Sequence, residues 1–435
     1  FVPGLVNAQM HGHGILANGF GDRWTFELLL WAGSWISGNR TLEDKYLATL
    51  IGAIEMLMKG CTACYDLTAE FPLPTPDGLD ACARAYQDAG MRAVVAPMVA
   101  NQSFFEAIPG LVDVLPDALR KEVDRLRTGP HEASIAAMRS SLDSWQFDRD
   151  IVRPAVAPTI PHHCTDDFMT ACRDLADEFD VGLHSHIQES KTQVIVGLKR
   201  YGKTQTAHLQ DLGLLSPTFV AAHGVWLDDD DIQRLAGHGA SLAHNPGSNM
   251  RLGNGMASAR RMIDCGLNIG IGTDGASCSD NLNMYEAMRL ASFTSKVQGP
   301  NTDHWLTTDD VLEAATVGSA RALGFGEKIG RIAVGYKADL VFLDLANVNW
   351  MPVNDPTNQL VHTEDGSAVH SVMVGGKIVI EDRKPVGFDL SALARKVEAA
   401  RERLEAANAA NKALFDRLEG IVNRYCPGLA STPYL

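Results

Sequence analysis

Helical and strand-like patterns of apolar positions alternate along the chain from its start to about residue 300. Residues 43–59 repeat apolar positions at helical spacing, and Gly60 directly after them is a typical helix stop. Strand-like runs and helical stretches then follow in turn at residues 61–66, 77–89, 92–98, 110–145 and 153–158. This alternation is typical of a β/α barrel. The chain therefore predicts an α/β fold, a TIM (β/α)8 barrel.

The pattern changes beyond the barrel. Residues 308–322 look helical, whereas residues 330–343 and 370–380 read as short strands with glycine turns. Residues 390–421 are rich in Ala, Glu and Arg at helical spacing, which predicts a helix that packs on the barrel or on a second subunit. The predicted organisation is a barrel at residues 1–325, a β-sandwich at 326–388, and a C-terminal helix and tail packing on the barrel at 389–435.

Residues that can carry chemistry stand where several strands end. The first apolar run leads into His11 and His13. Four later strand-like runs end at His184–Glu189, His223, His244 and Asp274. The active site of a TIM barrel lies at the carboxyl ends of its strands, and neutral imidazoles with a carboxylate suit zinc or iron. Any single histidine could be a packed core residue, but together the strand ends predict a metal site.

Five motifs resemble those of a known family, the amidohydrolase superfamily. They are Pro-Gly-Leu-Val-Asn-Ala at 3–8, His-x-x-Glu at 186–189, Ala-His-Gly-Val at 222–225, His-Asn-Pro-x-Ser-Asn at 244–249 and Gly-Thr-Asp-Gly at 272–275. The likeness covers roughly residues 1–385, and the branch holds cytosine, guanine and S-adenosylhomocysteine deaminases and chlorotriazine hydrolases. It implies a small β-sandwich completed by an N-terminal segment. Because this chain opens on the first barrel strand, we expect an N-terminally incomplete sandwich with an open edge.

The resemblance also implies roles for individual residues. Glu189 suits a general acid that protonates a ring nitrogen, and Asp274 accepts a proton from the attacking water. His223 is either a ligand or a hydrogen-bond partner of that water, and His163 is an alternative to its neighbour His162. The implied metal ligands are His11, His186, His223 and Asp274. The implied catalytic residues are Glu189, His223, His244 and Asp274, and the implied substrate-binding residues are His162, Glu189 and Asn249.

Gln9 departs from the family pattern, which has the first histidine of the metal pair at this position. A carboxamide oxygen is a weak, neutral ligand compared with imidazole, so metal affinity should fall. Three interpretations follow. Gln9 binds the metal weakly, or His13 takes over the ligand position, or the metal is lost and the protein is a catalytically degenerate binding protein.

The reaction implied by the resemblance is deamination of an amidine-type carbon in a heterocyclic amine, by attack of metal-bound hydroxide. The cofactor is one divalent metal ion, zinc rather than iron. Hydrolysis of another C–N or C–Cl bond is the alternative reaction. An aromatic group after the first strand suits a flat ring in the pocket or simple core packing; its members are Trp24, Phe26, Trp31 and Trp35.

Composition narrows the partners and the compartment. The formal net charge of −15 argues against a nucleic-acid partner. The sequence has no apolar run of membrane-spanning length and no signal-type N-terminus, so we expect no membrane association. Eight scattered cysteines, including Cys61 and Cys64, read as packed thiols of a cytoplasmic protein. The expected partners are a small-molecule substrate and a second copy of the chain in a homodimer.

Overall fold

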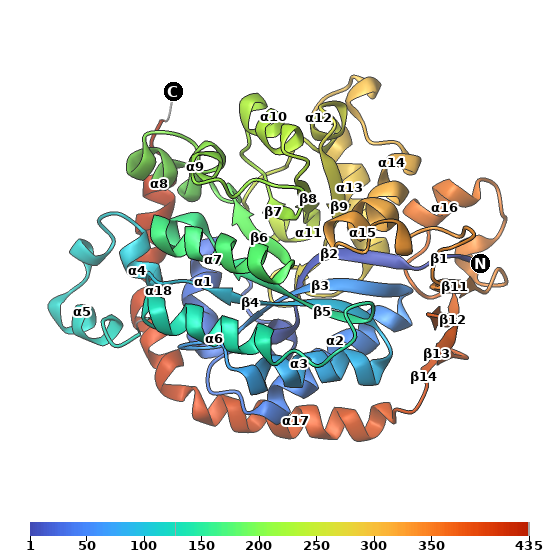
Figure 1. Ribbon diagram of the computed structural model, residues 1–435, viewed down its shortest axis with the longest axis horizontal. Helices are drawn as coiled ribbons and strands as arrows, with labels where there is room; N and C mark the ends of the chain where they lie inside the picture. Colours follow the sequence, from blue (N-terminus) through green and yellow to red (C-terminus); the bar gives the residue numbers. More distant parts are fainter. Residues whose placement is uncertain (127, 434–435) are drawn as a thin grey trace.

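A closed barrel of parallel strands forms the centre of the molecule, shown in Figure 1 as a computed structural model that describes residues 1–126 and 128–433. Its strands, in ring order, are β2 (Leu5–His11), β3 (Cys61–Ala69), β4 (Arg92–Val99), β5 (Val152–Pro158), β6 (Gly182–Ile187), β7 (Phe219–His223), β8 (Ser241–His244), and a last strand in two parts, β9 (Asn268–Ile271) and β10 (Asp274–Gly275). β9 pairs with β8, and β10 pairs with β2, which closes the ring. The predicted TIM barrel is confirmed.

The barrel strands are apolar throughout because they are covered on both faces. β3 is buried at all nine of its positions, and Cys61 and Cys64 within it are free, buried thiols as predicted. Small side chains such as Ala8 and Ala96 fill the interior together with Tyr65. Helices cover the outer face, so a continuous apolar run is the pattern expected of such a strand.

The helices follow the strands in alternation. Up to the small sheet they are α1 (Phe26–Ile36), α2 (Leu42–Met58), α3 (Pro76–Ala89), α4 (Phe104–Ala107), α5 (Asp117–Val123), α6 (His131–Asp143), α7 (Asp166–Phe179), α8 (Lys191–Tyr201), α9 (Gln205–Asp211), α10 (Asp229–Gly237), α11 (Pro246–Arg251), α12 (Ala259–Asp264), α13 (Met284–Lys296), α14 (Thr308–Glu313) and α15 (Ser319–Ala322). α2 starts at a capping box of Thr41 and Asp44 and stops before Gly60, whose φ is +76°.

The predicted helical stretch at 110–145 is divided into the two separate helices α5 and α6. Each begins directly after a proline, Pro116 or Pro130. A proline inside a helix removes a hydrogen bond and clashes with the preceding turn, so one continuous helix cannot form here. Residue 127 of this stretch, like residues 434–435 of the predicted tail, lies outside the described residues.

A five-stranded antiparallel sheet lies beside the barrel and matches the strands expected for the sandwich. Its strands, in spatial order, are β1 (Val2–Pro3), β11 (Leu340–Leu343), β12 (Val369–Val374), β13 (Lys377–Glu381) and β14 (Lys384–Pro385), and α16 (Pro356–His362) lies between β11 and β12 in the chain. β1 pairs only with Leu340 and Val341, so among the described residues Phe342 and Leu343 form an open strand edge on that side. The first residues of the chain thus join this sheet rather than the barrel.

Two C-terminal helices wrap the barrel. α17 (Leu390–Ala407) packs on α2, where Arg403 forms an ion pair with Asp44. α18 (Ala409–Ala430) packs on α1 and α8. In Figure 1 the small sheet lies at the right and α18 at the left, and α17 crosses below the barrel between them. Within the described part of the chain, no helix is long and apolar enough to span a membrane.

A buried ion pair joins the barrel to the small sheet. Arg92 begins β4 and Asp339 directly precedes β11, and both residues are 4% exposed. Arg92 Nε donates to Asp339 Oδ2 at 2.8 Å, and Nη2 donates to Oδ1 at 3.2 Å. The backbone N–H of Gly375, in the turn between β12 and β13, also donates to Asp339 Oδ1 at 2.6 Å. The carboxylate therefore connects three segments.

We expect Asp339→Ala to lower the free energy of unfolding by about 3–5 kcal/mol, because it leaves the guanidinium of Arg92 buried without its counter-charge. Urea unfolding of the variant and the parent measures this loss. Asp416→Ala is the matched control, since its carboxylate is exposed and pairs with Lys412 one helical turn away. That change should stay within about 0.5 kcal/mol. Equal losses at the two positions would contradict the prediction.

Candidate active site

A cavity of about 210 Å³ opens where the barrel strands end. The predicted site residues that line it are His11, His186, Glu189, His223 and Asp274. Much of the remaining wall is apolar and includes Phe26, Leu29, Leu30, Phe71, Met98 and Phe104. The cavity thus combines a polar cluster with an apolar wall, as small-molecule sites commonly do.

Two site residues have a backbone conformation that is rare outside glycine. His223, at the end of β7, has φ +72°, and Asp274, at the start of β10, has φ +60°. This left-handed conformation costs free energy and persists only where the surrounding structure enforces it. Such strain clusters at functional sites, and here it falls on two of the predicted metal ligands.

His11 and His186 present the same ring nitrogen to the site. Nδ1 of His11 donates to the carbonyl oxygen of Leu67 at 2.7 Å, and Nδ1 of His186 donates to that of Thr159 at 2.7 Å. In the neutral rings these bonds leave Nε2 with a free lone pair. The two Nε2 atoms lie 3.3 Å apart, and Asp274 Oδ1 is 3.1 Å from His11 Nε2.

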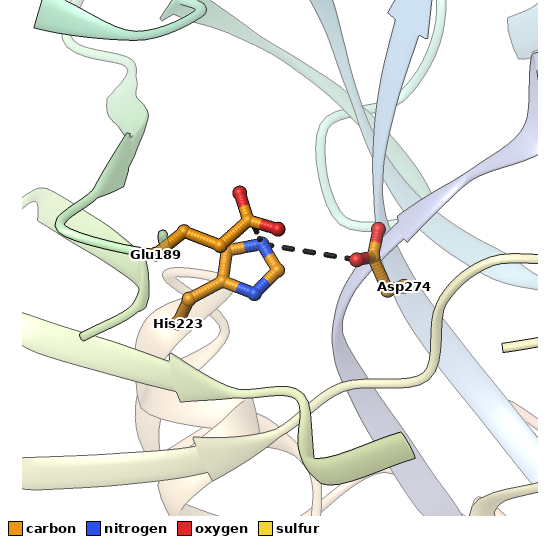
Figure 2. Close-up of side chains that lie close together, drawn as sticks. All are labelled: Glu189, His223 and Asp274. Atoms are coloured by element: carbon orange, nitrogen blue, oxygen red, sulfur yellow. Dashed lines mark ion pairs between the residues drawn. The ribbon is translucent and has the colours of Figure 1, made fainter. Parts of the chain in front are cut away.

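Glu189, His223 and Asp274 form the other half of the cluster (Figure 2). His223 Nε2 lies 3.5 Å from Glu189 Oε2 and 3.8 Å from Asp274 Oδ2. Nδ1 of His223 donates to Asn249 Oδ1 at 2.8 Å, which turns Nε2 towards the two carboxyl groups. Asn254 Nδ2 donates to Glu189 Oε1 at 2.9 Å. The structure thus brings together all four side chains expected to hold the metal.

The two carboxyl groups of the site are tuned in opposite directions. Burial, together with the negative charges of Asp274 and Glu27, raises the pKa of Glu189 well above its usual range. Burial acts in the same direction on Asp274, but the hydrogen bond and charge of His11 and the charge of His223 hold its pKa well below the usual range. Glu189 therefore holds its proton more strongly than an ordinary carboxyl group does, whereas Asp274 gives its proton up more readily.

The pKa values of His186 and His11 also shift in opposite directions. Burial and the neighbouring rings of His11 and His223 lower the pKa of His186 to about 3. Burial also disfavours a charge on His11, but the hydrogen bond and charge of Asp274 outweigh it and raise the pKa of His11. The carboxylate of Asp274 thus attracts positive charge to the position of His11 Nε2.

This set of residues fits a divalent metal ion. One ligand atom each of Glu189, His223 and Asp274 lie within 4.8 Å of one another. His223 Nε2 and Glu189 Oε2 are buried and have no hydrogen-bond partner among the described residues. The locked Nδ1 atoms of His11 and His186 leave their Nε2 lone pairs available. Imidazole nitrogens and carboxylate oxygens are suitable ligands for transition-metal ions such as zinc.

Of the adjacent histidines that follow β5, His163 and not His162 lines the cavity. Nδ1 of His162 accepts a hydrogen bond from Gln205 Nε2 at 3.0 Å. Burial, and then the charge of Arg200, lower the pKa of His163 to about 3, so this ring is neutral. Its Nε2 has no partner among the described residues. The structure thus places His163, the alternative raised by the sequence, at the cavity, and its contact with substrate stays a prediction.

The remaining predicted residues lie next to His223. His244 ends β8, and neither of its ring nitrogens has a hydrogen-bond partner in the described part of the chain. Burial and the proximity of His223 lower the pKa of His244 to about 4. Asn249 holds His223, which suits a positioning role, and its contact with substrate stays a prediction. His13 lines the cavity, with its ring centre 5.3 Å from that of His11.

Of the aromatic residues after the first strand, one lines the cavity and the others pack in the core. Phe26 lines the cavity. Trp24 and Trp35 instead pack against Phe415 of α18, at ring-centre distances of 5.5 and 5.3 Å. Trp31 packs against Phe105 at 4.9 Å. The tryptophans therefore form a core between α1, α18 and the α4 region.

Asn254 is a site residue that the sequence analysis missed. It is 5% exposed and bonds the carboxyl group of Glu189 from the loop after α11. The only signal in the sequence is a polar residue between Gly253 and Gly255, shortly after the His-Asn-Pro-x-Ser-Asn motif. Such a signal is common in loops, so it could not have singled out this residue.

Comparison with known proteins agrees with this geometry. Residues 1–379 match the amidohydrolase family. The chain belongs to the amidohydrolase family. Over 407 residues it is 33% identical to a 5-methylthioadenosine/S-adenosylhomocysteine deaminase of Syntrophomonas wolfei, covering 92% of this chain and 86% of the relative. It is 30% identical over 413 residues to a 5'-deoxyadenosine deaminase of Methanosarcina barkeri, covering 93% and 86%.

Solved structures lead to the same family. An adenosine deaminase from Xanthomonas campestris with bound zinc is 29% identical, with a TM-score of 0.81 and coverage of 93% of this chain and 86% of that one. An atrazine chlorohydrolase from Arthrobacter aurescens TC1 complexed with zinc is 25% identical, with a TM-score of 0.82 and coverage of 92% and 88%. This amidohydrolase is therefore a metal-dependent hydrolase that acts on non-peptide C–N bonds, as the motifs predicted.

Proposed function

We propose that this amidohydrolase removes ammonia from an amidine-type carbon of a planar heterocyclic amine. The observation that carries the proposal is the placement of two buried carboxyl groups, Glu189 and Asp274, 3.5 and 3.8 Å from His223 Nε2, with the pKa of Glu189 raised and that of Asp274 lowered. Two carboxyl groups tuned apart can serve as acid and base in one reaction. Deaminases among its relatives support this choice over other C–N bonds.

One divalent ion, zinc rather than iron, would be held by His11, His186, His223 and Asp274. When bound, it lowers the pKa of a coordinated water and so supplies a nucleophile near neutral pH. Asp274 accepts the proton that the attacking water gives up, because its carboxylate is ionised and faces the same space as His11 and His223. His223 would hold the ion through Nε2, which has a lone pair because Nδ1 donates to Asn249.

Glu189 protonates the ring nitrogen next to the carbon under attack. Its Oε1 accepts the N–H of Asn254, which leaves the acidic proton on Oε2. Oε2 faces His223 Nε2 at 3.5 Å and has no hydrogen-bond partner among the described residues. The proton is therefore held beside the site of attack, ready for transfer as the ring nitrogen gains negative charge.

The cavity wall favours a flat ring with an apolar substituent. Phe26, Leu29 and Leu30 offer apolar contact, and His163 offers an unpartnered neutral nitrogen that can bond a ring edge. Glu70, an acidic residue of the wall, is already paired with Lys45 and bonded to Thr75. A substrate whose outer part is apolar fits this wall better than one with charged groups.

The proposal places the enzyme in the cytoplasm as a homodimer with a small-molecule substrate. Free cysteines support a reducing compartment; all eight are unpaired thiols. The acidic balance of the chain disfavours nucleic acid as a partner.

The decisive experiment is an ammonia-release assay on a panel of adenosine-type compounds, guanine, cytosine and aminotriazines. We expect release from at least one compound, loss of release after chelation, and recovery on addition of zinc. Zinc-loaded protein that releases no ammonia from any of them would contradict the proposal. Chloride release from chlorotriazines without ammonia release would instead favour the alternative hydrolase.

A further inference from the structure

The side chain of Gln9 lies inside the polar cluster of the active site. Gln9 is fully buried on β2, two residues before His11. Its amide nitrogen is 2.9 Å from His11 Nε2, 3.5 Å from His186 Nε2 and 3.3 Å from Asp274 Oδ1. Three of the predicted metal ligands thus have their ligand atoms around the end of this one side chain.

The orientation of the amide is explained by the hydrogen-bonding groups around it. In their neutral form the His11 and His186 rings present Nε2 lone pairs, because their Nδ1 atoms donate to backbone carbonyls. Asp274 presents a carboxylate oxygen. An –NH₂ group suits a position surrounded by hydrogen-bond acceptors. The amide oxygen of Gln9 points elsewhere, buried and without a partner among the described residues.

We propose that Gln9 is a ligand of the metal ion and binds it through its amide oxygen. In this structure the amide –NH₂ lies against the ligand atoms of His11, His186 and Asp274. A half-turn of the amide about its terminal bond would place Oε1 where Nε2 now lies. This bond has a broad torsional preference, and the amide nitrogen and oxygen are similar in size. The proposal rests on the metal site of the proposed function.

Ligation by the amide predicts how tightly different metal ions are held. A bound ion would gain a neutral oxygen ligand from Gln9 in place of an imidazole nitrogen. Amide oxygen suits harder ions such as Mn²⁺, whereas imidazole favours zinc. Gln9 should therefore weaken zinc binding more than manganese binding, relative to a histidine at the same position. Zinc should exchange more readily from this site than from one with a histidine here.

Dissociation constants of Zn²⁺ and Mn²⁺ for purified variants test the proposal, measured by competition with a chromogenic chelator. Gln9→His should tighten zinc binding by on the order of 10–100-fold, the usual scale for a change that supports a metal site. Its effect on manganese should be smaller. Gln9→Leu should weaken both ions at least about tenfold. Gln9→Glu keeps the shape of the side chain and adds a charge, so it should tighten the binding of both ions. Tighter binding by this variant would show that a substitution at position 9 leaves the protein folded.

Gln102→Leu is the matched control, since Gln102 lines the same cavity but bonds Arg200. It should leave both constants unchanged. Gln9→Leu that binds both ions as the parent does, or more tightly, would overturn the proposal. The proposal would also be overturned if His13→Ala weakened metal binding as much as His186→Ala does while Gln9→Leu did not weaken it. If His186→Ala also binds metal normally, the metal site of the proposed function fails as well.

Discussion

Replacing Asp274 with asparagine is expected to lower kcat for ammonia release by about 10⁴-fold, the upper end of the range for a general acid–base group. Asparagine keeps the shape of the side chain but cannot accept the proton of the attacking water. It is also a weaker ligand than a carboxylate, so metal content should fall too. Steady-state kinetics and elemental analysis of the same preparation measure the two effects.

Asp229→Asn is the control for this change. Asp229 is an exposed residue of α10 that pairs with Arg261, and it is not part of the cavity wall described above. Its kcat and metal content should equal those of the parent. An Asp274→Asn enzyme that retains more than about a tenth of the parental kcat would rule out Asp274 as the proton acceptor, because general acid–base groups contribute at least about 10²-fold.

Glu189→Gln should lower kcat by about 10²–10⁴-fold while the protein keeps its metal. Glutamine is nearly isosteric and can still bond Asn254, but it has no acidic proton to give to the ring nitrogen. The measurement is kcat together with metal content. Loss of metal along with activity would show instead that Glu189 is a metal ligand. The ligand atoms of Glu189, His223 and Asp274 lie within 4.8 Å of one another, so the experiment must distinguish the two roles.

Asn254→Ala provides the companion variant. Asn254 bonds Glu189 Oε1 and is a positioning residue in this account. Its loss should lower kcat by about 10–100-fold, the scale typical of a residue that supports a site. KM should change less than kcat, because the apolar wall that binds the substrate is untouched. A loss equal to that of Glu189→Gln would mean that Asn254 itself takes part in proton transfer.

The sequence by itself determined the barrel and most of the polar cluster. Strands buried on both faces need continuous apolar runs, and parallel strands carry their carboxyl ends to one mouth. His11, His186, His223 and Asp274 each stand at such an end, so their convergence follows from the topology alone. The alternation of helix and strand periods was enough to establish that topology.

Only the tertiary structure decided between His162 and His163. Adjacent residues of a strand face opposite sides of a sheet. These two residues lie in a short 3-10 helix after β5, Pro161–His163, where this alternation does not apply. The direction of each ring is set by its partners, and Gln205 of α9 holds His162. Such a partner is more than forty positions away in the chain and leaves no local signal.

The tertiary structure also decided what the aromatic residues after the first strand do. Trp24 and Trp35 read equally well as pocket walls or as core. Their burial depends on Phe415 of α18, almost four hundred residues later. Local periodicity reports which face of an element is apolar, but not which distant element covers that face. The surroundings of Gln9 were likewise decided by the tertiary structure. Its amide lies against ligand atoms contributed by three different strands.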